Sequence, residues 1–338
     1  WCVSRTATAE ADMQVIIPLA GKGTRLRPHT HLVPKPLLKV AGRPVMDWVM
    51  DRLDGLDVSE LIFITGHLKE QVEAYARARY RIPSRFIEQK VQDGTAGAVN
   101  LARPHVREPV LIIFVDTVFE ADLTLINRTD ADGIIWAKEV EDYQRFGVVV
   151  TDDKGYMTRI VEKPSTPISR LANIGLYYIR AVDSLWQGID HVLASPKNKG
   201  EYFLTDAFQW MIEHGRRILT AEVGGWYDCG APGTLLETNE TLLRQGAARR
   251  VDFPGVTIHD PVYIEDGVTI EGSEIGPNVS LERGTKVRGS RVRNAIVGRE
   301  AAITDSTLDG ALLGNHVVVE GYRGMASLGD HSEVTTKG

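Results

Sequence analysis

The chain has 338 residues, of which 43% are hydrophobic and 25% charged, proportions that are ordinary for a globular protein. This length predicts one large domain with a smaller one, or two domains of medium size. The net charge of −6 argues against general nucleic-acid binding, since no basic arm or stripe offsets it. Any ligand phosphates must therefore be held by a local cluster of basic residues.

Cysteine content and hydropathy indicate the cellular compartment and whether the chain spans a membrane. Two cysteines, Cys2 and Cys229, are too few for a disulfide framework and are typical of a reducing cytoplasm. No apolar run approaches the roughly 20 residues of a membrane span, so we expect no membrane partner. Residues 1–12 lack the basic start and apolar core of a signal peptide. We expect a disordered leader or an artificial remnant there, with the folded chain beginning near Met13.

A glycine-containing loop follows the first predicted strand. Val15–Ile17 is a short β-branched run typical of a buried parallel strand, and it leads into Gly21-Lys22-Gly23-Thr24-Arg25. Two glycines two residues apart allow a sharp turn with several converging N–H groups. Basic residues flank this turn, among them Arg25 and Lys35. The pattern indicates a site for a triphosphate or pyrophosphate, and an ordinary turn with solvated basic residues is the alternative.

Two common phosphate-binding motifs do not fit this loop. It is not G-x-x-x-x-G-K-[ST], because Thr24 follows Gly23 and no lysine precedes a hydroxyl residue at the required place. It is not G-x-G-x-x-G either, because Leu26 occupies the position of the third glycine. The loop therefore belongs to neither of these two classes.

Strand and helix patterns alternate along the next segment. Helices are predicted over Pro44–Leu56 and Lys69–Arg79, and strands over Leu61–Ile64 and Arg85–Ile87. This alternation predicts an open, mostly parallel sheet with helices on both faces. Because ligands bind at the carboxyl ends of strands in such sheets, the residues just after each strand are candidates for a binding site.

Two of these strand ends carry suitable side chains. Gln89 and Gly94 follow the strand at Arg85–Ile87; an amide can donate to and accept from a base edge, and a glycine lets a base lie against the backbone. The most hydrophobic run, Val110–Val115, is the predicted central strand and delivers Asp116 to the same edge. A carboxylate opposite a triphosphate loop is a suitable Mg²⁺ ligand, and a turn residue is the alternative.

The later part of the chain contains further strands and then a repeat. A helix through Met211 is predicted to be capped by Thr205 or Asp206. Cys229 has no neighbouring histidine implied, so we expect a small buried residue and not a nucleophile. Beyond Arg250, hexapeptides beginning at Val256, Val262 and Val268 repeat, less strictly farther on, with the six-residue period of a parallel β-helix.

The glycine loop resembles that of the sugar-1-phosphate nucleotidyltransferases, in particular the glucose-1-phosphate thymidylyl- and uridylyltransferases. Their pattern A-G-x-G-T-R-L, followed about ten residues later by P-K-P, is matched by Ala20–Leu26 and Pro34–Pro36. Other motifs follow in the family's order as far as Leu243, among them Phe146-Gly147-Val148, Glu162-Lys163-Pro164, Gly200–Asp206 and Trp226–Gly230. One motif departs, since the family writes G-D-N where this chain has Val115-Asp116-Thr117.

The resemblance implies a role for each matching position. Arg25 and Lys35 would grip the phosphates of a nucleoside triphosphate, and Lys163 would hold the phosphate of the sugar. The nucleotide would lie against Ala20, Gly21, Gly23, Thr24, Gln89 and Gly94. The sugar phosphate would contact Gly147, Glu162, Lys163, Asn173 and Gly175, although Gly175 fits a β-bulge equally well. Asp116 and Asp228 would carry Mg²⁺.

The same resemblance implies a fold and a reaction. We expect a Rossmann-like nucleotidyltransferase domain over residues 13–248, a short left-handed β-helix over 251–325 and a frayed polar tail over 326–338. The implied reaction joins an NTP, with dTTP or UTP favoured, to a sugar 1-phosphate, with glucose 1-phosphate favoured. It gives an NDP-sugar and pyrophosphate by in-line displacement. The implied enzyme is a cytoplasmic homo-oligomer.

Three alternatives stay open from the sequence. Gly94–Ala98 also resembles the guanylyltransferases that use mannose 1-phosphate. An acyltransferase built on the β-helix would use His259 or His316 as a base, although the helix is short and both histidines fit an exposed surface. A non-catalytic sugar-nucleotide sensor is suggested only by Val115 and Thr117 in place of the usual glycine and asparagine.

Overall fold

The computed structural model describes residues 13–336, so the leader expected at residues 1–12 lies outside the described residues. The chain divides into two compact units. The first contains residues 13–21, Met50–Val115 and Phe119–Trp226, and the second contains Lys22–Val49, Asp116–Val118 and residues 227–336. The glycine loop from Lys22 onward and Asp116 thus group with the hexapeptide repeats, and the domain bounds expected from the sequence stay a prediction.

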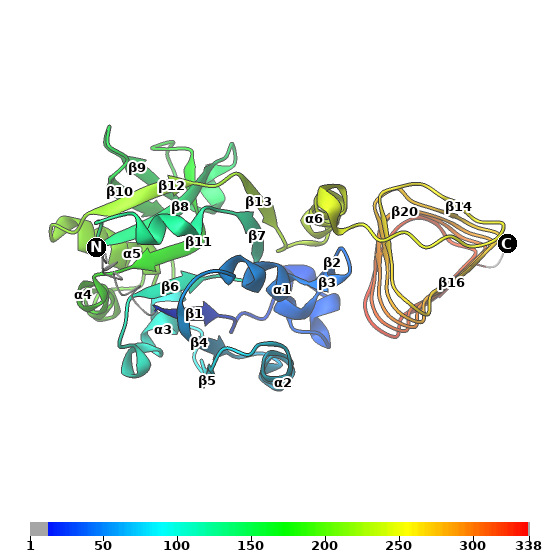
Figure 1. Ribbon diagram of the computed structural model, residues 1–338, viewed down its shortest axis with the longest axis horizontal. Coiled ribbons are helices and arrows are strands. Elements are labelled where there is room, and N and C mark those ends of the chain that lie inside the picture. Colours follow the sequence, from blue (N-terminus) through cyan, green and yellow to red (C-terminus); the bar gives the residue numbers. More distant parts are fainter. Residues whose placement is uncertain (1–12, 337–338) are drawn as a thin grey trace, which may run out of the picture. The chain divides into compact units, whose positions relative to one another are not determined.

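The first unit is built on an open sheet of nine strands (Figure 1). The strands are β1 (Met13–Pro18), β4 (Val58–Thr65), β5 (Ser84–Glu88), β6 (Val110–Ile113), β8 (Gly133–Glu139), β9 (Gly147–Thr151), β10 (Met157–Glu162), β11 (Leu171–Ile179) and β12 (Ile218–Glu222). Their order is β10-β9-β11-β6-β1-β4-β5, and β8 pairs with β11 and β12. Strands β6, β1, β4 and β5 are mutually parallel, as are β8 and β12, whereas β11 is antiparallel to its neighbours. The predicted α/β class is confirmed.

Burial explains why the central strands are uniformly apolar. Val15–Ile17 in β1 and all of β6 are fully buried, as expected for parallel strands covered on both faces. The helices α3 (Thr95–Asn100), α4 (Val182–Ala194) and α5 (Leu204–Glu213) pack against one another and share one hydrophobic cluster with these strands. Helix α2 (Lys69–Arg79) packs beside β5 and has the bounds that the sequence predicted.

Short helices, turns and two-stranded sheets connect the strands of the large sheet. Helix α1 (Val45–Met50) and a 3-10 turn at Asp51–Leu53 cover the central part of the range predicted as helical, Pro44–Leu56, whereas Pro44 belongs to a strand and the residues after Leu53 are not helical. A hairpin of β2 (Lys39–Val40) and β3 (Arg43–Pro44) precedes α1, and a second two-stranded sheet pairs β7 (Thr117–Glu120) with β13 (Gly225–Asp228). Helix α6 (Pro232–Leu242) then leads to the repeats. None of the helices in the described part of the chain is long and apolar enough to cross a membrane.

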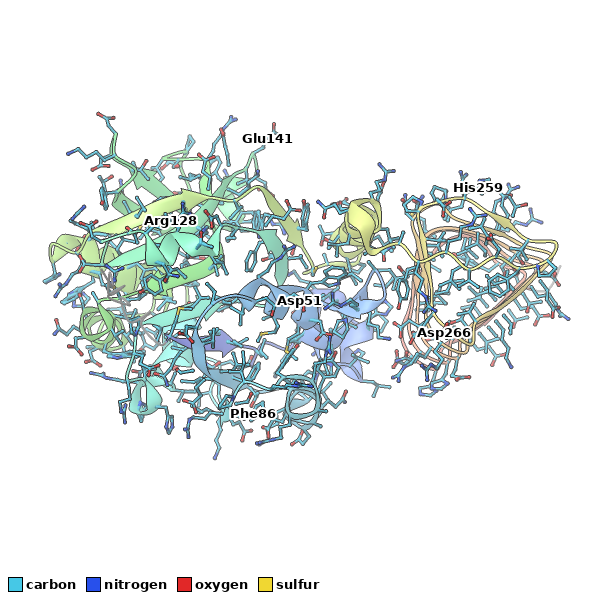
Figure 2. The ribbon with its side chains drawn as sticks, viewed as in Figure 1. Asp51, Phe86, Arg128, Glu141, His259 and Asp266 are labelled. Carbon is cyan, nitrogen blue, oxygen red and sulfur yellow. The ribbon has the colours of Figure 1, made fainter. Side chains whose placement is uncertain are left out.

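The hexapeptides of the second unit form a parallel β-helix, seen in Figure 1 as stacked triangular coils. Its strands are β14 (Thr257–Ile258), β15 (Val262–Ile264), β16 (Thr269–Glu271), β17 (Glu274–Ile275), β18 (Val279–Leu281), β19 (Lys286–Arg288), β20 (Arg291–Val297), β21 (Ala302–Thr304), β22 (Thr307–Leu313), β23 (Val318–Glu320), β24 (Arg323–Leu328) and β25 (Glu333–Thr335). Each strand from β14 to β23 pairs in parallel with a strand one coil farther on, and β24 and β25 end the stack. Apolar residues at the hexapeptide positions fill the interior, and His259 and Asp266 lie on the outside (Figure 2).

Two expectations are wrong. The tail from Ala326 is not frayed up to Thr335, because β24 and β25 add a further turn to the β-helix and pair with β22 and β23. Neither Thr205 nor Asp206 caps α5, whose N-cap residue is Phe203. The Thr205 hydroxyl donates to Glu162, and Asp206 accepts from Asn198, so tertiary partners take both groups.

The hydrophobic cluster of the first unit generates a stability prediction. Phe208 is fully buried and its ring lies 4.9 Å from that of Tyr177. We expect Phe208→Ala to lower the free energy of unfolding by about 3–5 kcal/mol, because it leaves a cavity. Urea unfolding followed by circular dichroism measures this. Val91→Ala, at an exposed side chain, should change it by less than about 0.5 kcal/mol. Equal effects of the two changes would contradict the packing described.

Candidate active site

The glycine loop closes on itself and on Lys35. Gly23 has φ +59, a left-handed backbone that favours glycine, and it precedes a 3-10 turn at Thr24–Leu26. A Cβ at Gly23 would lie 3.0 Å from the Thr30 side chain and 3.2 Å from Lys35 Cβ. The Thr30 hydroxyl also donates to the Gly23 carbonyl over 2.9 Å. The turn is therefore built so that the loop and Lys35 lie together, with Thr24 and Arg25 exposed.

Two cations and two carboxylates gather around this loop. Lys35 Nζ lies 3.5 Å from Asp116 Oδ2, with the lysine largely covered and the aspartate half-exposed. A Cβ at Gly230 would lie 2.8 Å from both Arg25 Nη2 and Asp228 Oδ1, so the guanidinium and the carboxylate both lie against this glycine. Residues far apart in the sequence therefore form one cluster with charges of both signs.

Backbone groups hold the two aspartates in place. The Cys229 N–H donates to the Asp116 carbonyl over 2.9 Å, and the Gly230 N–H donates to Asp228 Oδ1 over 2.8 Å. Thr238 on α6 donates its hydroxyl to the Asp228 carbonyl over 2.9 Å.

Cys229 lies beside these groups but does not serve as a nucleophile. Burial raises the pKa of the Cys229 thiol to about 12, so this residue is inert as a nucleophile, as expected.

The donor set at this cluster suits Mg²⁺. Within residues 13–336, no group of three or more His, Cys, Asp or Glu side chains is arranged to hold a metal ion. A cation would therefore depend on Asp116 and Asp228 together with oxygens of a bound phosphate. Mg²⁺ is commonly bound in this way, by one or two carboxylates, substrate phosphates and waters.

In the first unit, Gln89 and Gly94 lie together as the sequence predicted. Gln89 is buried, and its amide donates to Asp93 over 3.2 Å and to the Gly94 carbonyl over 3.4 Å. Gly94 has φ +126, and a Cβ there would lie 2.3 Å from the Tyr202 carbonyl oxygen. Close packing against the backbone of Tyr202 thus requires a glycine here, independently of any ligand.

The start of the glycine loop is fixed by a residue that the sequence did not single out. Gln92 donates its amide to the Ala20 carbonyl over 2.7 Å. Gly66 allows close packing from the other strand end, since a Cβ there would lie 2.7 Å from the same carbonyl. Around Gly21, by contrast, a Cβ would meet nothing within 4 Å. Ala20 is therefore clamped, while the space beside Gly21 is open.

A second cluster in the first unit surrounds Glu162. Its carboxylate accepts from the Thr205 hydroxyl over 3.1 Å and lies 3.8 Å from Lys163 Nζ. Asn173 donates to the Gly147 carbonyl over 2.8 Å and accepts from Tyr177. A Cβ at Gly147 would lie 2.3 Å from the Asn173 amide and 2.8 Å from Glu162 Oε2. Four of the predicted sugar-phosphate residues are thus brought together.

Burial and backbone geometry distinguish this second cluster. Burial raises the pKa of the Glu162 carboxyl, with Lys163 opposing the change. Lys163 has φ +46, which is uncommon for a lysine, and its N–H donates to the Phe146 carbonyl over 2.9 Å. Lys199 donates its ammonium to the carbonyls of both Glu162 and Lys163. The sequence did not single out Lys199, although its place just before the Gly-Glu motif is a usable signal.

Gly175 is not part of this hydrogen-bonded cluster. It has φ +77 at a point where the pairing of β11 with β8 shifts register. A Cβ there would lie 3.0 Å from the Phe114 side chain, and the Gly175 carbonyl accepts from the Phe114 N–H over 2.9 Å. These features are those of a bulge glycine, the structural alternative left open by the sequence. Its proposed contact with a sugar stays a prediction.

The two histidines of the acyltransferase alternative have neighbours on the β-helix. His259 Nε2 lies 3.0 Å from Glu274, which also pairs with Arg291. The ring of His316 stacks on that of His331 with centroids 4.7 Å apart. Both contacts account for these residues as parts of the coil surface.

Comparison with known proteins identifies a family for the chain. The family model described as "Nucleotidyl transferase" matches residues 14–245. Relatives include "Bifunctional protein GlmU" of Methanococcus aeolicus, 35% identical over 78% of this chain and 62% of that protein. "UTP--glucose-1-phosphate uridylyltransferase AglF" of Haloferax volcanii is 32% identical over 69% and 98%. "Glucose-1-phosphate thymidylyltransferase" of Streptomyces griseus is 27% identical over 95% and 98%.

A solved structure shares the fold. A crystal structure of UDP-glucose pyrophosphorylase complexed with UDP-glucose superposes with a TM-score of 0.62 at 22% identity, covering 69% of this chain and 99% of that one. The chain spans 62% of the length of the GlmU relative, so the full activity of that protein does not carry over. The family match over more than half of its length shows that the chain belongs to the nucleotidyl transferase family, as its glycine loop predicted.

Proposed function

We propose that the protein transfers a nucleotidyl group from an NTP to a sugar 1-phosphate and releases pyrophosphate. The observation that carries the proposal is the gathering of Arg25, Lys35, Asp116 and Asp228 at the glycine loop. Such a cluster presents fixed cations and carboxylates to a triphosphate. The proposed reaction needs no nucleophile or general base from the protein. Relatives named for glucose 1-phosphate support the choice of sugar 1-phosphate as acceptor.

The reaction balances with little covalent work by the protein. A phosphate oxygen of the sugar 1-phosphate attacks the α-phosphorus of the NTP, the new P–O bond forms in line, and the bond to the β-phosphate breaks. Pyrophosphate leaves with the electron pair. The attacking phosphate is already anionic at neutral pH, so no proton has to be removed. Catalysis then consists of positioning the two phosphates and neutralising the charge that develops.

Each cluster has a part in this scheme. Arg25 would bind the β- and γ-phosphates, and Lys35 the α-phosphate and bridging oxygen, because a guanidinium and an ammonium suit these oxygens. Asp116 and Asp228 would hold Mg²⁺, which supplies further neutralisation of the phosphates when bound. Lys163 would hold the attacking phosphate, and Glu162 would accept hydrogen bonds from sugar hydroxyls.

We favour a pyrimidine nucleotide, dTTP or UTP, with glucose 1-phosphate. Gln89 offers an amide next to Gly94 for a base edge, and two relatives are named for uridylyl or thymidylyl transfer to glucose 1-phosphate. The cytoplasmic location and homo-oligomeric state expected from the sequence stay predictions.

A substrate panel tests the reaction directly. Purified protein with Mg²⁺ should release pyrophosphate with dTTP or UTP and glucose 1-phosphate, as measured by a coupled phosphate assay. Release only with GTP and mannose 1-phosphate would replace the favoured pair by the guanylyltransferase alternative. No release across all common NTPs and sugar 1-phosphates, from a folded protein, would contradict the proposed reaction and favour a sugar-nucleotide sensor.

The charge cluster generates a second prediction. Lys35→Ala and Asp116→Asn should each lower kcat by about 10²–10³-fold, because each removes one fixed charge that faces the phosphates. Circular dichroism should show that both variants stay folded. Lys154→Ala removes an exposed lysine from a turn at Asp152–Gly155 and serves as the matched control, with unchanged kcat. Turnover close to wild type in either cluster variant would contradict these roles.

The raised pKa of Glu162 generates a third prediction. The carboxylate form accepts hydroxyl hydrogen bonds more strongly than the protonated form, so kcat/KM for the sugar 1-phosphate should fall as the pH drops through this raised pKa. Glu162→Gln should have a lower kcat/KM and lack this acidic limb. The phosphate of the substrate titrates in the same way with both proteins. The difference between the two pH profiles therefore reports the titration of Glu162 alone. An acidic limb of the same size in both proteins would assign the titration to the substrate instead.

A further inference from the structure

The segment that carries Lys35 lies along one corner of the β-helix, within the second unit. At one end, a Cβ at Gly329 would lie 2.9 Å from Pro28 Cβ, and His29 Nε2 lies 3.0 Å from Ser327 Oγ. At the other end, Lys39 Nζ lies 2.8 Å from Glu282 Oε2. The loop and the repeats are thus connected on both sides of Lys35.

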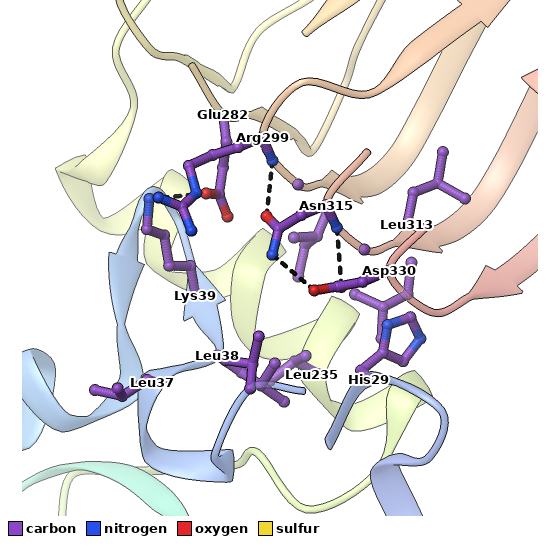
Figure 3. A pocket seen from close by; sticks show the side chains of 15 residues that line it. His29, Leu37, Leu38, Lys39, Leu235, Glu282, Arg299, Leu313, Asn315 and Asp330 are labelled. Carbon is purple, nitrogen blue, oxygen red and sulfur yellow. Dashed lines mark hydrogen bonds and ion pairs between the residues drawn. The ribbon is translucent and has the colours of Figure 1, made fainter. Parts of the chain in front are cut away.

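The Lys39–Glu282 ion pair, at 2.8 Å, is the shorter of the two polar contacts, and Figure 3 shows the two side chains directed toward each other. Only 10% of the Glu282 side chain is exposed, and burial raises the pKa of its carboxyl while Lys39 opposes the change. A buried ion pair recovers little net stability, because desolvation offsets the attraction. What such a pair does supply is a defined position for the groups that it joins.

Helix α6 adds a second, uncharged connection. Asn239 is fully buried; its amide oxygen accepts from the Ala41 N–H over 2.8 Å and from the Ser280 hydroxyl over 2.6 Å. Its amide nitrogen donates to the Asn278 carbonyl over 3.2 Å. The preceding residue, Thr238, holds the Asp228 carbonyl. One turn of α6 therefore links the β-helix to both the hairpin after Lys35 and a candidate metal ligand.

Between these two ends, a cavity of about 90 Å³ separates part of the segment from the β-helix. It is lined by Val33, Leu37 and Leu38 of the segment and by Ile296 and Leu312 of the β-helix, among others. Figure 3 shows Leu37 and Leu38 at this cavity. A continuous apolar core would fix the loop by close packing. Because this cavity interrupts the packing, the connection between the segment and the β-helix depends on the contacts at the two ends, and these add to the contacts of Lys35 with Gly23 and Asp116.

We propose that the β-helix positions the catalytic loop, with Glu282 and Asn239 as positioning residues for Lys35 and Asp228. They act through Lys39, Ala41 and α6, not by touching a substrate. The proposal rests on the proposed function for its kinetic consequence, and on the structure alone for its effect on loop mobility.

The test uses the full chain with a substitution at each end of the segment, at Glu282 and at Gly329. Glu282→Ala should raise KM for the NTP by about tenfold, because a small displacement of a phosphate-binding group is costly, while KM for the sugar 1-phosphate stays unchanged. Glu282→Gln keeps an acceptor for Lys39 and should restore most of this loss. Gly329→Ala, which presses on Pro28 at the other end, should act in the same direction. It keeps the proposal testable if Glu282→Ala does not fold.

Hydrogen exchange provides a readout that does not depend on activity. Amides of residues 22–38 should exchange faster in Glu282→Ala than in the wild type, whether or not any substrate is turned over. Absence of turnover in the wild type would therefore contradict the proposed function while leaving the positioning proposal to be decided by exchange.

The matched control lies in the same β-helix but away from the loop. Ser290 is buried, donates to the Arg288 carbonyl and accepts from the Ser306 N–H. Ser290→Ala should lower the melting temperature and leave both KM values and the exchange of residues 22–38 unchanged. Equal kinetic or exchange effects in Ser290→Ala and Glu282→Ala would overturn the proposal, since they would reflect general loss of stability. So would wild-type NTP binding and exchange in Glu282→Ala.

Discussion

The groups proposed to bind the triphosphate lie on segments with little regular structure, so a few tertiary contacts must hold them. Arg25 and Lys35 belong to short 3-10 turns, which supply few hydrogen bonds of their own. Three features fix where these cations lie. The left-handed backbone of Gly23 and the ion pair with Asp116 position Lys35, and the absence of a side chain at Gly230 leaves room for Arg25. Because the cluster contains two cations and two carboxylates, its formal charges balance before a ligand binds. Such preorganised charge is what stabilises a phosphoryl-type transition state.

The second cluster follows the same logic with different means. Lys163 adopts a backbone conformation that is unfavourable for a lysine, and such conformations persist only where the surroundings determine them. Here the surroundings are the Phe146 carbonyl, which accepts from the Lys163 N–H, and the ammonium of Lys199. Thr205 orients the neighbouring Glu162 carboxylate. The β-helix, in turn, is more than an appended repeat, because the anchors at Glu282 and Asn239 connect it to the loop that carries Lys35.

Much of the fold was predictable because its signals are local. The apolar run at Val110–Val115, the helix at Lys69–Arg79 and the six-residue repeat each follow from periodicity within a short window. The tail failed for the opposite reason. The segment after Ala326 is short and mostly polar. It is only through pairing with the preceding coil that β24 and β25 form strands. The expected cap on α5 failed because Thr205 had a better partner in Glu162, far away in the sequence.

The sequence by itself determined the glycine loop, the strand-end carboxylates and the coil of the repeats, since each depends on neighbouring residues and on the family that these motifs resemble. Only the tertiary structure decided which side chains meet. Lys39 reaches Glu282, Gln92 reaches Ala20, and Lys199 reaches the carbonyl of Lys163. Each of these contacts joins segments with no local signal in common. The free energy of such a contact depends on distance and burial in the folded chain, which no window of sequence contains.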